Sequence, residues 1–488
     1  MSSKTLLDPS IWTGKLASGG WREGAGERAV VEPATGAEIG RVGMAGPRDV
    51  AQAAERAAVA QREWAATPYP ERAAVLRRAG GLWQQHADEV RQWLITEAGS
   101  IPPKAGVETD TAAQECFEAA ALTSAPLGDL LPSTQDRLSM TRRVPAGVVG
   151  VIAPFNFPLI LSIRSVAPAL ALGNAVILKP DPRTAVSGGI ALARIFEAAG
   201  LPEGVLHVLP GGVDAGEALV TDPRVPLISF TGSTNAGRRV GELASRHLKR
   251  AHLELGGNSA IVVLDDADLD AAVGLGAWGS FLHSGQICMT TGRHLVHESL
   301  VADYVERLAA KADALPVGNP ATEQVALGPI IDAGQRDKIH GLVTATADAG
   351  AKIAAGGSYT DLFYRPTVLA GVRPEMPAYA EEVFGPVAPV VPFTDLEQAA
   401  GLAAASEYGL SLGIVTRDVA KGLALAERIP TGIVHINDQT VNDEAIAPFG
   451  GTGASGTGSR FGGPAANIEA FTETRWITVR GQAASYPF

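Results

Sequence analysis

Short β-branched runs alternate with segments of helical periodicity from about residue 147, and this alternation limits the possible folds of the chain more than any other feature. Helical stretches separate four runs that read as strands: GVVGVIAPF, AVILKP, GVLHVLPG and PLISFTG. Such alternation predicts a parallel sheet with crossover helices, which is a doubly wound α/β domain. Ligands of these sheets bind beyond the carboxyl ends of the strands, which directs attention to Pro154–Pro158, Lys179, Gly211 and Gly232.

Other segments complete the expected organisation. Residues 47–125 are predicted to be mainly helical, with one helix over 47–66 and a second over 70–99. A second α/β pattern begins after residue 255 and runs to about residue 450. Residues 125–145 are rich in proline and polar residues and are predicted to form an extended arm. The stretch FTETRWITVR alternates like an exposed edge strand, which favours pairing with another chain.

Composition excludes several classes of protein. The 488 residues suffice for two or three domains, and 46% hydrophobic with 19% charged residues is typical of a folded protein. A formal charge of −12 argues against a nucleic-acid partner, and no run reaches the ~18 apolar residues of a membrane helix. The start MSSKTLLDPSIW lacks signal-peptide features, and two cysteines cannot form a disulfide framework, so a cytoplasmic protein is expected. The histidines show no zinc-binding spacing, so no metal site is expected.

Two side chains are candidates for covalent or acid–base chemistry. Cys288 lies in SGQICMTTG, a segment rich in glycine, glutamine and threonine. A lone cysteine is more often a small buried hydrophobe, and Cys116 in AAQECFEAAAL is interpreted that way. Glu254, in HLELGGN, lies in an apolar strand-like context, where desolvation would raise its pKa and suit a general base. The alternative is a strand glutamate that faces solvent.

Three segments carry candidates for binding, each with a simpler alternative. In SFTGSTNAGRRVGELA, Gly232, Ser233 and Gly237 lie where a strand passes into a helix, whose first N–H groups could hold a pyrophosphate or only form a cap. Lys179 ends the strand VILKP and could donate to ribose hydroxyls or remain a solvated charge. Asn156, between the rings and prolines of PFNFP, could donate its amide to an oxyanion or close a turn.

Six motifs occur in one order along the chain: PFNFP, LKP, FTGSTNAG, LELGGN, GQIC and EEVFGP. Together they resemble those of the aldehyde dehydrogenase superfamily, over nearly the whole chain. RSVAPALALGNAVILKPD, VLHVLPGG, GRHLVH and HINDQTVNDE carry a closer likeness to the NAD-linked benzaldehyde dehydrogenases and, next, to the vanillin dehydrogenases. The resemblance implies the aldehyde dehydrogenase fold: a Rossmann-like doubly wound cofactor domain, an α/β catalytic domain and a small β arm for oligomerisation. The expected bounds are 1–124 and 146–255 for the NAD-binding domain, 256–455 for the catalytic domain, and 125–145 with 468–488 for the arm.

The resemblance implies oxidation of an aldehyde to the free carboxylic acid. Cys288 matches the nucleophile that forms a thiohemiacetal and then a thioester, and Asn156 with the backbone N–H of Cys288 matches the oxyanion donors. Glu254 matches the base that activates the hydrolytic water. Relatives that acylate coenzyme A generally lack this base, so acid is the expected product. The segment SGTGSRFGG has Phe461 where many relatives have a second carboxylate, and His283 is predicted to be a packing or positioning residue.

The resemblance also implies a nicotinamide cofactor. Glu382 and Phe384 would hold its nicotinamide end, and Lys179 would bind its adenosine ribose. The other expected cofactor residues are Ile152, Phe155, Gly212, Phe230, Gly232, Ser233, Gly237 and Leu255. Pro182 stands where many relatives that prefer NAD have a glutamate, and the neighbouring Arg183 could favour a 2′-phosphate. NAD is expected from the benzaldehyde dehydrogenase likeness, with NADP as the alternative.

The expected substrate is a benzaldehyde-like aromatic aldehyde, with vanillin-type or medium-chain aliphatic aldehydes as alternatives. Phe157, Leu161, Ile287 and Met289 are predicted to form an apolar pocket, in which Arg164 either holds a hydroxyl or anionic group or pairs elsewhere. The resemblance implies a homodimer or homotetramer, with no nucleic-acid or membrane partner. A catalytically silent relative and non-redox acyl transfer on the same cysteine are the alternatives from other classes.

Overall fold

Five parallel strands form most of the first sheet. The computed structural model describes residues 5–488, and this sheet has the order β10-β9-β6-β7-β8-β1-β2. Strands β10 to β8 run parallel, whereas β1 and β2 add an antiparallel hairpin at one edge. The bounds are β10 Arg250–Glu254, β9 Leu227–Thr231, β6 Val148–Ile152, β7 Ala175–Lys179, β8 Leu206–Val208, β1 Lys15–Ala17 and β2 Trp21–Glu23. The predicted doubly wound arrangement is confirmed, and the hairpin is an addition that the pattern did not indicate.

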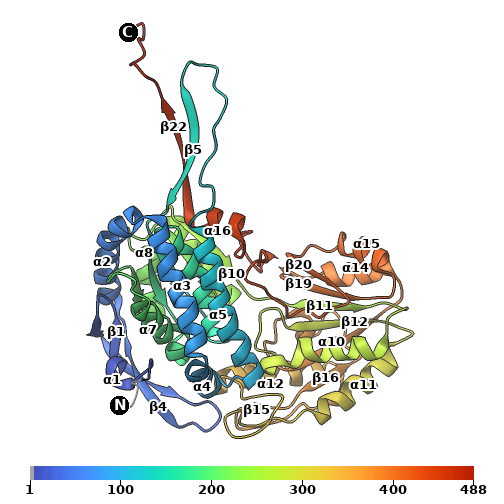
Figure 1. Cartoon of the computed structure of the whole chain (residues 1–488). Coiled ribbons are helices and arrows are strands. Elements are labelled where there is room, and N and C mark those ends of the chain that lie inside the picture. The colour runs from blue at the N-terminus through green and yellow to red at the C-terminus, as the bar shows by residue number, and fades with distance from the viewer. Residues whose placement is uncertain (1–4) are drawn as a thin grey trace.

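Helices cover both faces of this sheet, so β6 is buried along its whole length (Figure 1). Alternate residues of β6 belong to different apolar clusters: Val149 and Val151 to one, Val148 and Ile152 to the other. This is the pattern expected of a strand that is covered on both faces. The helices are α2 Pro47–Ala66, α3 Tyr69–Gln85, α4 Ala87–Ala98, α5 Pro102–Leu122, α6 Pro158–Ala171, α7 Ala191–Ala198, α8 Val213–Thr221 and α9 Thr234–Arg246. This sheet and these helices are called the first lobe below.

The structure divides the helix predicted over 70–99 into α3 and α4. The chain leaves helical geometry at His86, whose φ of −107° and ψ of 19° end α3. Asp88 and Glu89 then lie in the first turn of α4, where carboxylates favour a new helix start. The helical pattern after Pro182 likewise begins with a 3₁₀ turn and a π-helical turn before α7.

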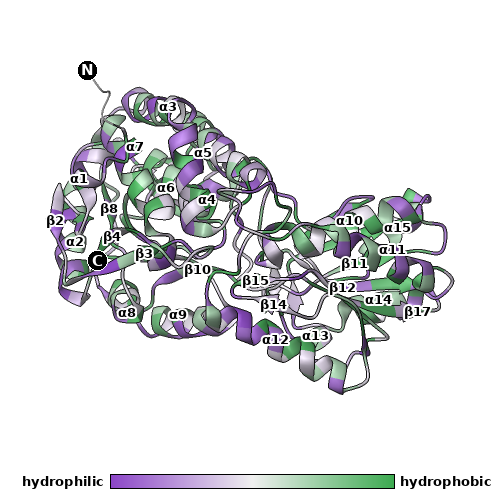
Figure 2. Ribbon diagram, turned by 90° about the horizontal axis from the view of Figure 1, so that it is seen from below, coloured by the Kyte–Doolittle hydropathy of each residue, from purple (hydrophilic) through white to green (hydrophobic). Residues whose placement is uncertain are grey.

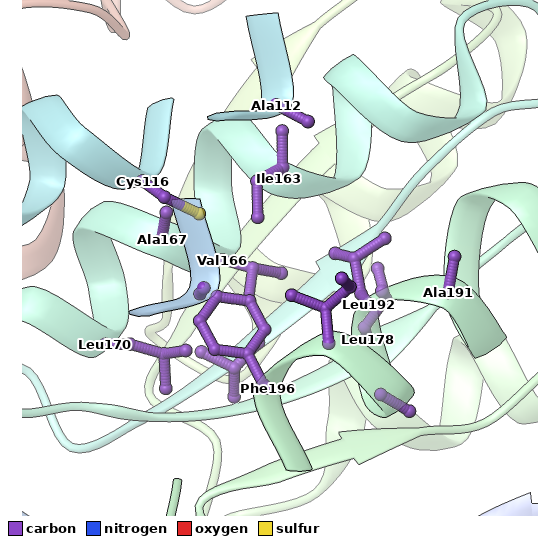
Figure 3. Packing of buried hydrophobic residues seen from close by; sticks show 14 of the residues in the cluster. Ala112, Cys116, Ile163, Val166, Ala167, Leu170, Leu178, Ala191, Leu192 and Phe196 are labelled. Carbon is purple, nitrogen blue, oxygen red and sulfur yellow. The ribbon is translucent and has the colours of Figure 1, made fainter. Parts of the chain in front are cut away.

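Helices α5, α6 and α7 enclose an apolar core in the first lobe. Figure 3 shows Cys116 of α5 among Ala112, Ile163 and Ala167, and its side chain is fully buried. Burial raises the pKa of this thiol. Cys116 is therefore a core residue, as predicted. Helix α6 is mainly apolar (Figure 2), and every one of its residues is buried, including Ser162, Arg164 and Ser165. A mainly apolar helix of this kind lies inside the core.

The second sheet lies in a second lobe and has the order β13-β16-β17-β12-β11-β19-β20. Only β13 is antiparallel to its neighbour. Its strands are β13 Lys352–Ala355, β16 Thr367–Ala370, β17 Val387–Phe393, β12 Thr291–His297, β11 Ser259–Val263, β19 Ser411–Val415 and β20 Ile433–Ile436. Its helices are α10 Leu269–Phe281, α11 Val301–Ala314, α12 Ala333–Asp348, α13 Pro377–Ala380, α14 Leu396–Ala404 and α15 Val419–Ala426. The second α/β pattern of the sequence is thus confirmed.

A two-stranded arm projects from the first lobe (Figure 1). It consists of β5 (Leu138–Pro145) and β22 (Thr472–Val479), which pair antiparallel along their full length. Helix α16 (Pro464–Phe471) leads into β22. The two segments that the sequence marks as an arm and as an edge strand are therefore partners of one another. The small elements are α1 Pro9–Trp12, β3 Gly26–Val31, β4 Glu38–Met44, β14 Tyr359–Thr360, β15 Phe363–Tyr364, β18 Tyr408–Gly409 and β21 Thr452–Gly453.

Candidate active site

A cavity of about 680 Å³ opens at the carboxyl ends of three parallel strands of the first sheet. Ile152, Lys179 and Thr231 end β6, β7 and β9, and all three line it. The cavity reaches Cys288 and is also lined by Glu382 and other residues of the second lobe. Its volume is within the range of small-molecule sites, roughly 300–1,000 Å³. Its place is the one where doubly wound sheets bind their ligands.

Most of the residues predicted to bind a cofactor or to take part in catalysis line this cavity. They are Ile152, Phe155, Asn156, Lys179, Gly212, Phe230, Gly232, Ser233, Leu255, Cys288, Glu382 and Phe384, and the predicted pocket residue Leu161 joins them. The other predicted residues are not among those that line it: Phe157, Arg164, Gly237, Glu254, Ile287 and Met289.

Cys288 lies in a loop between a 3₁₀ turn, Leu282–Gly285, and β12. His283 and Ser284 in that turn have φ of 50° and 53°. This left-handed conformation is uncommon in non-glycine residues and clusters at functional sites. At Gly285 a Cβ would lie 2.0 Å from the carbonyl oxygen of Gly385, so the chain can pass there only as glycine. The loop thus holds Cys288 at the cavity wall.

The Cys288 thiol reaches the cavity but is deep within the molecule. Burial, followed by the carboxylates of Glu382 and Glu254, raises its pKa to about 12, against an opposing effect of Arg164. The thiol is therefore protonated at neutral pH, and the thiolate needed for nucleophilic attack requires a base or a nearby positive charge. Glu254 and Glu382 are close enough to act on this proton electrostatically.

Glu254 ends β10 with a nearly fully buried side chain, 3% exposed. Neither carboxyl oxygen has a partner in normal hydrogen-bond geometry among residues 5–488. Burial raises the pKa of Glu254 well above 4.5, although Arg460 and Arg164 oppose the rise. An unpartnered carboxyl group of raised pKa is suited to accept a proton. Glu254 is therefore buried and has a raised pKa, as predicted, and it does not face solvent.

Asn156 lies between β6 and α6, where its amide faces the cysteine loop. Its Nδ2 donates to the carbonyl oxygen of Gln286 over 2.9 Å. A primary amide has two N–H groups, so the second can serve an oxygen atom in the cavity. A hydrogen bond also fixes the backbone of Asn156, because Nζ of Lys104 donates to its carbonyl oxygen over 2.7 Å.

Two helix starts and one lysine also line the cavity. Gly212 precedes α8 and Ser233 caps α9, accepting from the N–H of Ala236 over 3.4 Å. At Gly232 a Cβ would lie 2.7 Å from the tip of the Phe230 ring, so a side chain there would have to displace that ring. Helix starts offer unpaired N–H groups and positive potential to an anion. Lys179 adds a cation whose Nζ makes only a 3.5 Å contact with the Pro180 carbonyl, and burial lowers its pKa.

Glu382 lies where the two lobes meet. Its Oε1 accepts from the N–H of Gly257 over 3.0 Å, and burial raises its pKa to about 7. A Cβ on Gly256 would lie 2.4 Å from its Oε2, and a Cβ on Gly257 would lie 2.3 Å from the carbonyl oxygen of Cys288, so both glycines of LELGGN are closely packed. The next ring, Phe384, lies edge-on to Phe155 at 6.0 Å between centroids.

Asp181 and Arg183 form an ion-paired cluster around Pro182 at the cavity wall. Asp181 accepts from Nε of Arg183 over 3.0 Å and from Nη2 over 2.8 Å, while Nη1 donates to Asp332 over 2.6 Å. The guanidinium also lies 4.3 Å from the centre of the Phe155 ring. The positive charge of Arg183 is therefore matched by two carboxylates.

Cys288 packs against an apolar cluster. Ile287, Met289, Leu410 and Phe449 form its buried part, and Phe157 packs against it. Ile287 and Met289 point into this cluster as chain neighbours of the nucleophile candidate. The four predicted apolar pocket residues are thus divided, with Leu161 at the cavity and the other three in the cluster.

Arg164 is buried in α6 and forms an ion pair with Asp443. Its guanidinium lies 4.6 Å from the centre of the Phe449 ring, so it borders the apolar cluster. Nε and Nη1 of Arg164 and Oδ1 of Asp443 lack a hydrogen-bond partner among residues 5–488. Burial raises the pKa of nearby Glu115 to about 7, against the opposing charge of Arg164. Arg164 is therefore paired with a carboxylate, which is the second of the two alternatives predicted for it. Its Nε and Nη1, and Oδ1 of Asp443, remain as donors and an acceptor for a further polar group.

Gly237 supports the cavity from behind. A Cβ at this position would lie 2.1 Å from Cδ2 of Leu255, whose side chain lines the cavity. Gln335 and Lys338 of α12 are among the lining residues that the sequence did not single out. They donate to the backbone oxygens of Phe384 over 2.9 Å and of Glu382 over 3.0 Å. Neither stands in a motif, so no local signal could have identified them.

The described part of the chain contains neither a candidate membrane helix nor a candidate metal cluster. No helix there is long and apolar enough to cross a membrane. Residues 5–488 also contain no group of three or more His, Cys, Asp or Glu side chains placed to hold a metal ion.

Comparison with known proteins confirms the resemblance drawn from the motifs. The sequence model of the aldehyde dehydrogenase family matches residues 21–477. A vanillin dehydrogenase of an Amycolatopsis species is 73% identical over 485 residues, covering 99% of this chain and all of the relative. A benzaldehyde dehydrogenase [NAD(+)] of Pseudomonas putida is 52% identical over 480 residues, 98% of each chain. The crystal structure of a salicylaldehyde dehydrogenase from Pseudomonas putida G7, complexed with salicylaldehyde, has a TM-score of 0.94 at 34% identity, covering 98% of this chain and 99% of that one.

Proposed function

The chain belongs to the aldehyde dehydrogenase family, and from this premise we propose that it oxidises aromatic aldehydes to free carboxylic acids with NAD as the hydride acceptor. One observation carries the proposal: Cys288 and Asn156 share a single cavity with Lys179 and Glu382, and Glu254 lies within electrostatic reach of the thiol. The names of the relatives at 73% and 52% identity, a vanillin and a benzaldehyde dehydrogenase, support the aromatic substrate class.

Thiohemiacetal formation is the first step of the proposed reaction. The Cys288 thiol releases its proton to solvent, Sγ attacks the aldehyde carbon, and the carbonyl electron pair moves to oxygen. The second N–H of Asn156 Nδ2 and the backbone N–H of Cys288 stabilise that oxygen, each contributing roughly 3–4 kcal/mol to the lowering of the barrier. NAD, when bound, supplies the hydride acceptor.

Thioester hydrolysis completes the reaction. Loss of hydride from the thiohemiacetal carbon leaves a thioester on Cys288. Glu254 takes a proton from a water molecule, whose oxygen attacks the thioester carbon; the C–S bond then breaks and releases the carboxylic acid. One aldehyde, one water and one NAD thus give one acid, one reduced NAD and one proton.

The residues at the cavity fit a dinucleotide. Phosphates suit the helix starts at Gly212 and Ser233, next to a glycine at 232 that no side chain could replace without shifting the Phe230 ring. Lys179 and Glu382 lie on different lobes of the same cavity, which supports a role for each in binding one of the two riboses, and Phe384 would border the nicotinamide.

The Asp181–Arg183–Asp332 cluster supports NAD over NADP. Arg183 already pairs with two carboxylates, so it offers little net positive charge to a 2′-phosphate. Asp181, which lines the cavity, would repel that phosphate. It supplies a carboxylate next to the position at which Pro182 replaces the glutamate of many relatives.

A hydroxylated aromatic aldehyde is the second candidate substrate class. The cluster of Ile287, Met289, Leu410 and Phe449 suits a flat ring. Arg164 and Asp443 at its border keep two donors and one acceptor for a ring hydroxyl. Both benzaldehyde and vanillin are therefore expected to react.

The assembly and the location of the protein are also part of the proposal. We assign the cofactor to 1–124 and 146–255, catalysis to 256–455, and oligomerisation to the arm at 125–145 and 468–488. The exposed arm supports a homodimer or homotetramer, and a sequence with two unpaired cysteines suits the cytoplasm.

The test is a steady-state assay of NAD and NADP reduction with benzaldehyde, vanillin and hexanal. We expect both aromatic aldehydes to react with NAD, hexanal to have a kcat/KM about tenfold lower, and Cys288→Ala to be inactive while still binding NAD. A kcat/KM for hexanal more than about tenfold above that for benzaldehyde would contradict the aromatic assignment. No cofactor reduction with any pair, together with no NAD binding, would favour the catalytically silent alternative.

A further inference from the structure

A fully buried ion pair contacts the backbone next to Asn156. Lys104 and Glu108 are one turn apart on α5, their side chains are 0% exposed, and Nζ to Oε1 is 2.5 Å. Neither lines the cavity, and none of the proposed chemical steps uses them. Burial lowers the pKa of Lys104 and raises that of Glu108, so each depends on the other for its charge.

The pair holds the chain on both sides of Phe157. Lys104 Nζ donates to the Asn156 carbonyl oxygen over 2.7 Å, and it lies 4.3 Å from the centre of the Phe157 ring. Oε2 of Glu108 accepts from the N–H of Leu159 over 3.1 Å and, more weakly, of Ile160 over 3.4 Å. Helix α6 has no capping side chain of its own at Phe157, so Glu108 supplies the missing cap from another helix.

The contacts continue to the cysteine loop. Phe157 meets the His283 ring edge-on, 5.7 Å between centroids, and Asn156 Nδ2 donates to Gln286 O over 2.9 Å. The pair, Asn156 and the loop of Cys288 therefore form one connected unit.

Stability alone does not account for such a pair. Replacing a buried ion pair by apolar residues of similar volume is often neutral or stabilising, because desolvation offsets the attraction between the charges. We propose that Lys104 and Glu108 are positioning residues that aim the Asn156 amide at the oxyanion. This inference rests on the proposed function, which makes Asn156 an oxyanion donor.

The test is a double-mutant cycle between the pair and Asn156. In Lys104→Met/Glu108→Leu we expect kcat for benzaldehyde to fall about 10–100-fold, since a misplacement of ~1 Å can cost about 10²-fold. KM and the Kd of NAD should change less than threefold. In an Asn156→Ala background the same two substitutions should lower kcat less than twofold, which a merely structural defect would not produce.

A matched control is the exposed pair Arg91–Asp110, which joins α4 to α5. Arg91→Met/Asp110→Leu should leave kcat unchanged. Where Lys104→Met/Glu108→Leu does not fold, Glu108→Gln enters the same cycle. A kcat within twofold of wild type, or an equal loss with and without Asn156, would overturn the positioning role. An Asn156→Ala variant of full activity would instead overturn the proposed function at that residue.

Discussion

Individual side chains of this protein carry charge states set by burial. Glu254 is the clearest case, because burial raises its pKa well above 4.5 despite the opposing charges of Arg460 and Arg164. Cys288 is similar, since its pKa of about 12 leaves the resting thiol protonated. The charge states of these two side chains can therefore be tested with single substitutions and with pH profiles.

Replacing Glu254 should separate the two half-reactions. Glu254→Gln keeps the volume but loses the base, so thioester formation continues while hydrolysis slows by roughly 10²–10⁴-fold. In stopped-flow absorbance we expect one burst of reduced NAD per site, followed by a slow steady state. A variant without a burst, or with an undiminished steady-state rate, would show that Glu254 is not the hydrolytic base.

The pH profile should report the raised pKa of Glu254. The base works only as carboxylate, so thioester hydrolysis should be fast above its pKa and fall as pH drops through it. Because burial raises this pKa well above 4.5, the midpoint of the acidic limb should lie well above 4.5. Single-turnover hydrolysis measured from pH 5 to 9 checks this. A hydrolysis rate that does not change between pH 5 and pH 9 would contradict the expected direction of the pKa shift.

Arg164 should discriminate between substituted rings. Arg164→Met removes the donors beside Asp443, so kcat/KM for vanillin should fall about 10–100-fold, as for loss of a hydrogen bond to a charged group worth about 1.5–3 kcal/mol. Benzaldehyde, which lacks the hydroxyl, should change less than threefold. Arg164→Met/Asp443→Leu controls for the unpaired carboxylate, with thermal unfolding as the measure of stability. An equal loss for both aldehydes would refute a role in recognition.

At the scale of elements, local sequence patterns predict strands and motifs, because each of these is defined by residues that are close together in the chain. The β-branched runs of β6, β7 and β9 and their order indicate the sheet and the edge where the cavity lies. They do not indicate that His86 divides a long helical pattern. They also give no sign of α12, whose Gln335 and Lys338 reach the cavity only through the packing of the second lobe.

The buried charges of the site show the same limit. The sequence singles out Arg164 but not its partner Asp443, 279 positions away in the chain. It marks Asn156 but not Lys104, which contacts it from a different helix. Such pairs are defined by tertiary contacts, and no spacing rule for helices or strands brings them together.

Gly237 of α9 packs against Leu255, whose side chain lines the cavity. In Gly237→Ala the added Cβ would overlap Leu255 Cδ2 and push this side chain into the cavity. We expect the Kd of NAD, measured by calorimetry, to rise about tenfold, which is within the ~1–3 kcal/mol cost of overpacking. Gly241→Ala is the control on the same helix, because its Cβ would meet Leu253, which does not line the cavity, at 3.1 Å. Equal Kd values for both variants would show that the close contact at Gly237 does not shape the site.

At the scale of the whole molecule, both lobes contribute residues to the site. The first lobe supplies strand ends and helix starts, and the second supplies the cysteine loop and Glu382. The arm belongs to neither function. A two-stranded ribbon is only marginally stable in water, so the paired β5 and β22 point to a covering partner.

The arm should therefore control assembly. Leu138, Trp476 and Val479 are 48%, 65% and 48% exposed on it, and we propose that a second copy of the chain covers them. In Trp476→Glu the charge would have to enter that interface without a partner, which is costly when desolvated. Sedimentation velocity should show wild-type dimers or tetramers and a variant shifted towards monomer. Val59→Glu, at a residue 62% exposed on α2, should leave the mass unchanged. An unchanged mass for Trp476→Glu would mean that the arm is not the interface.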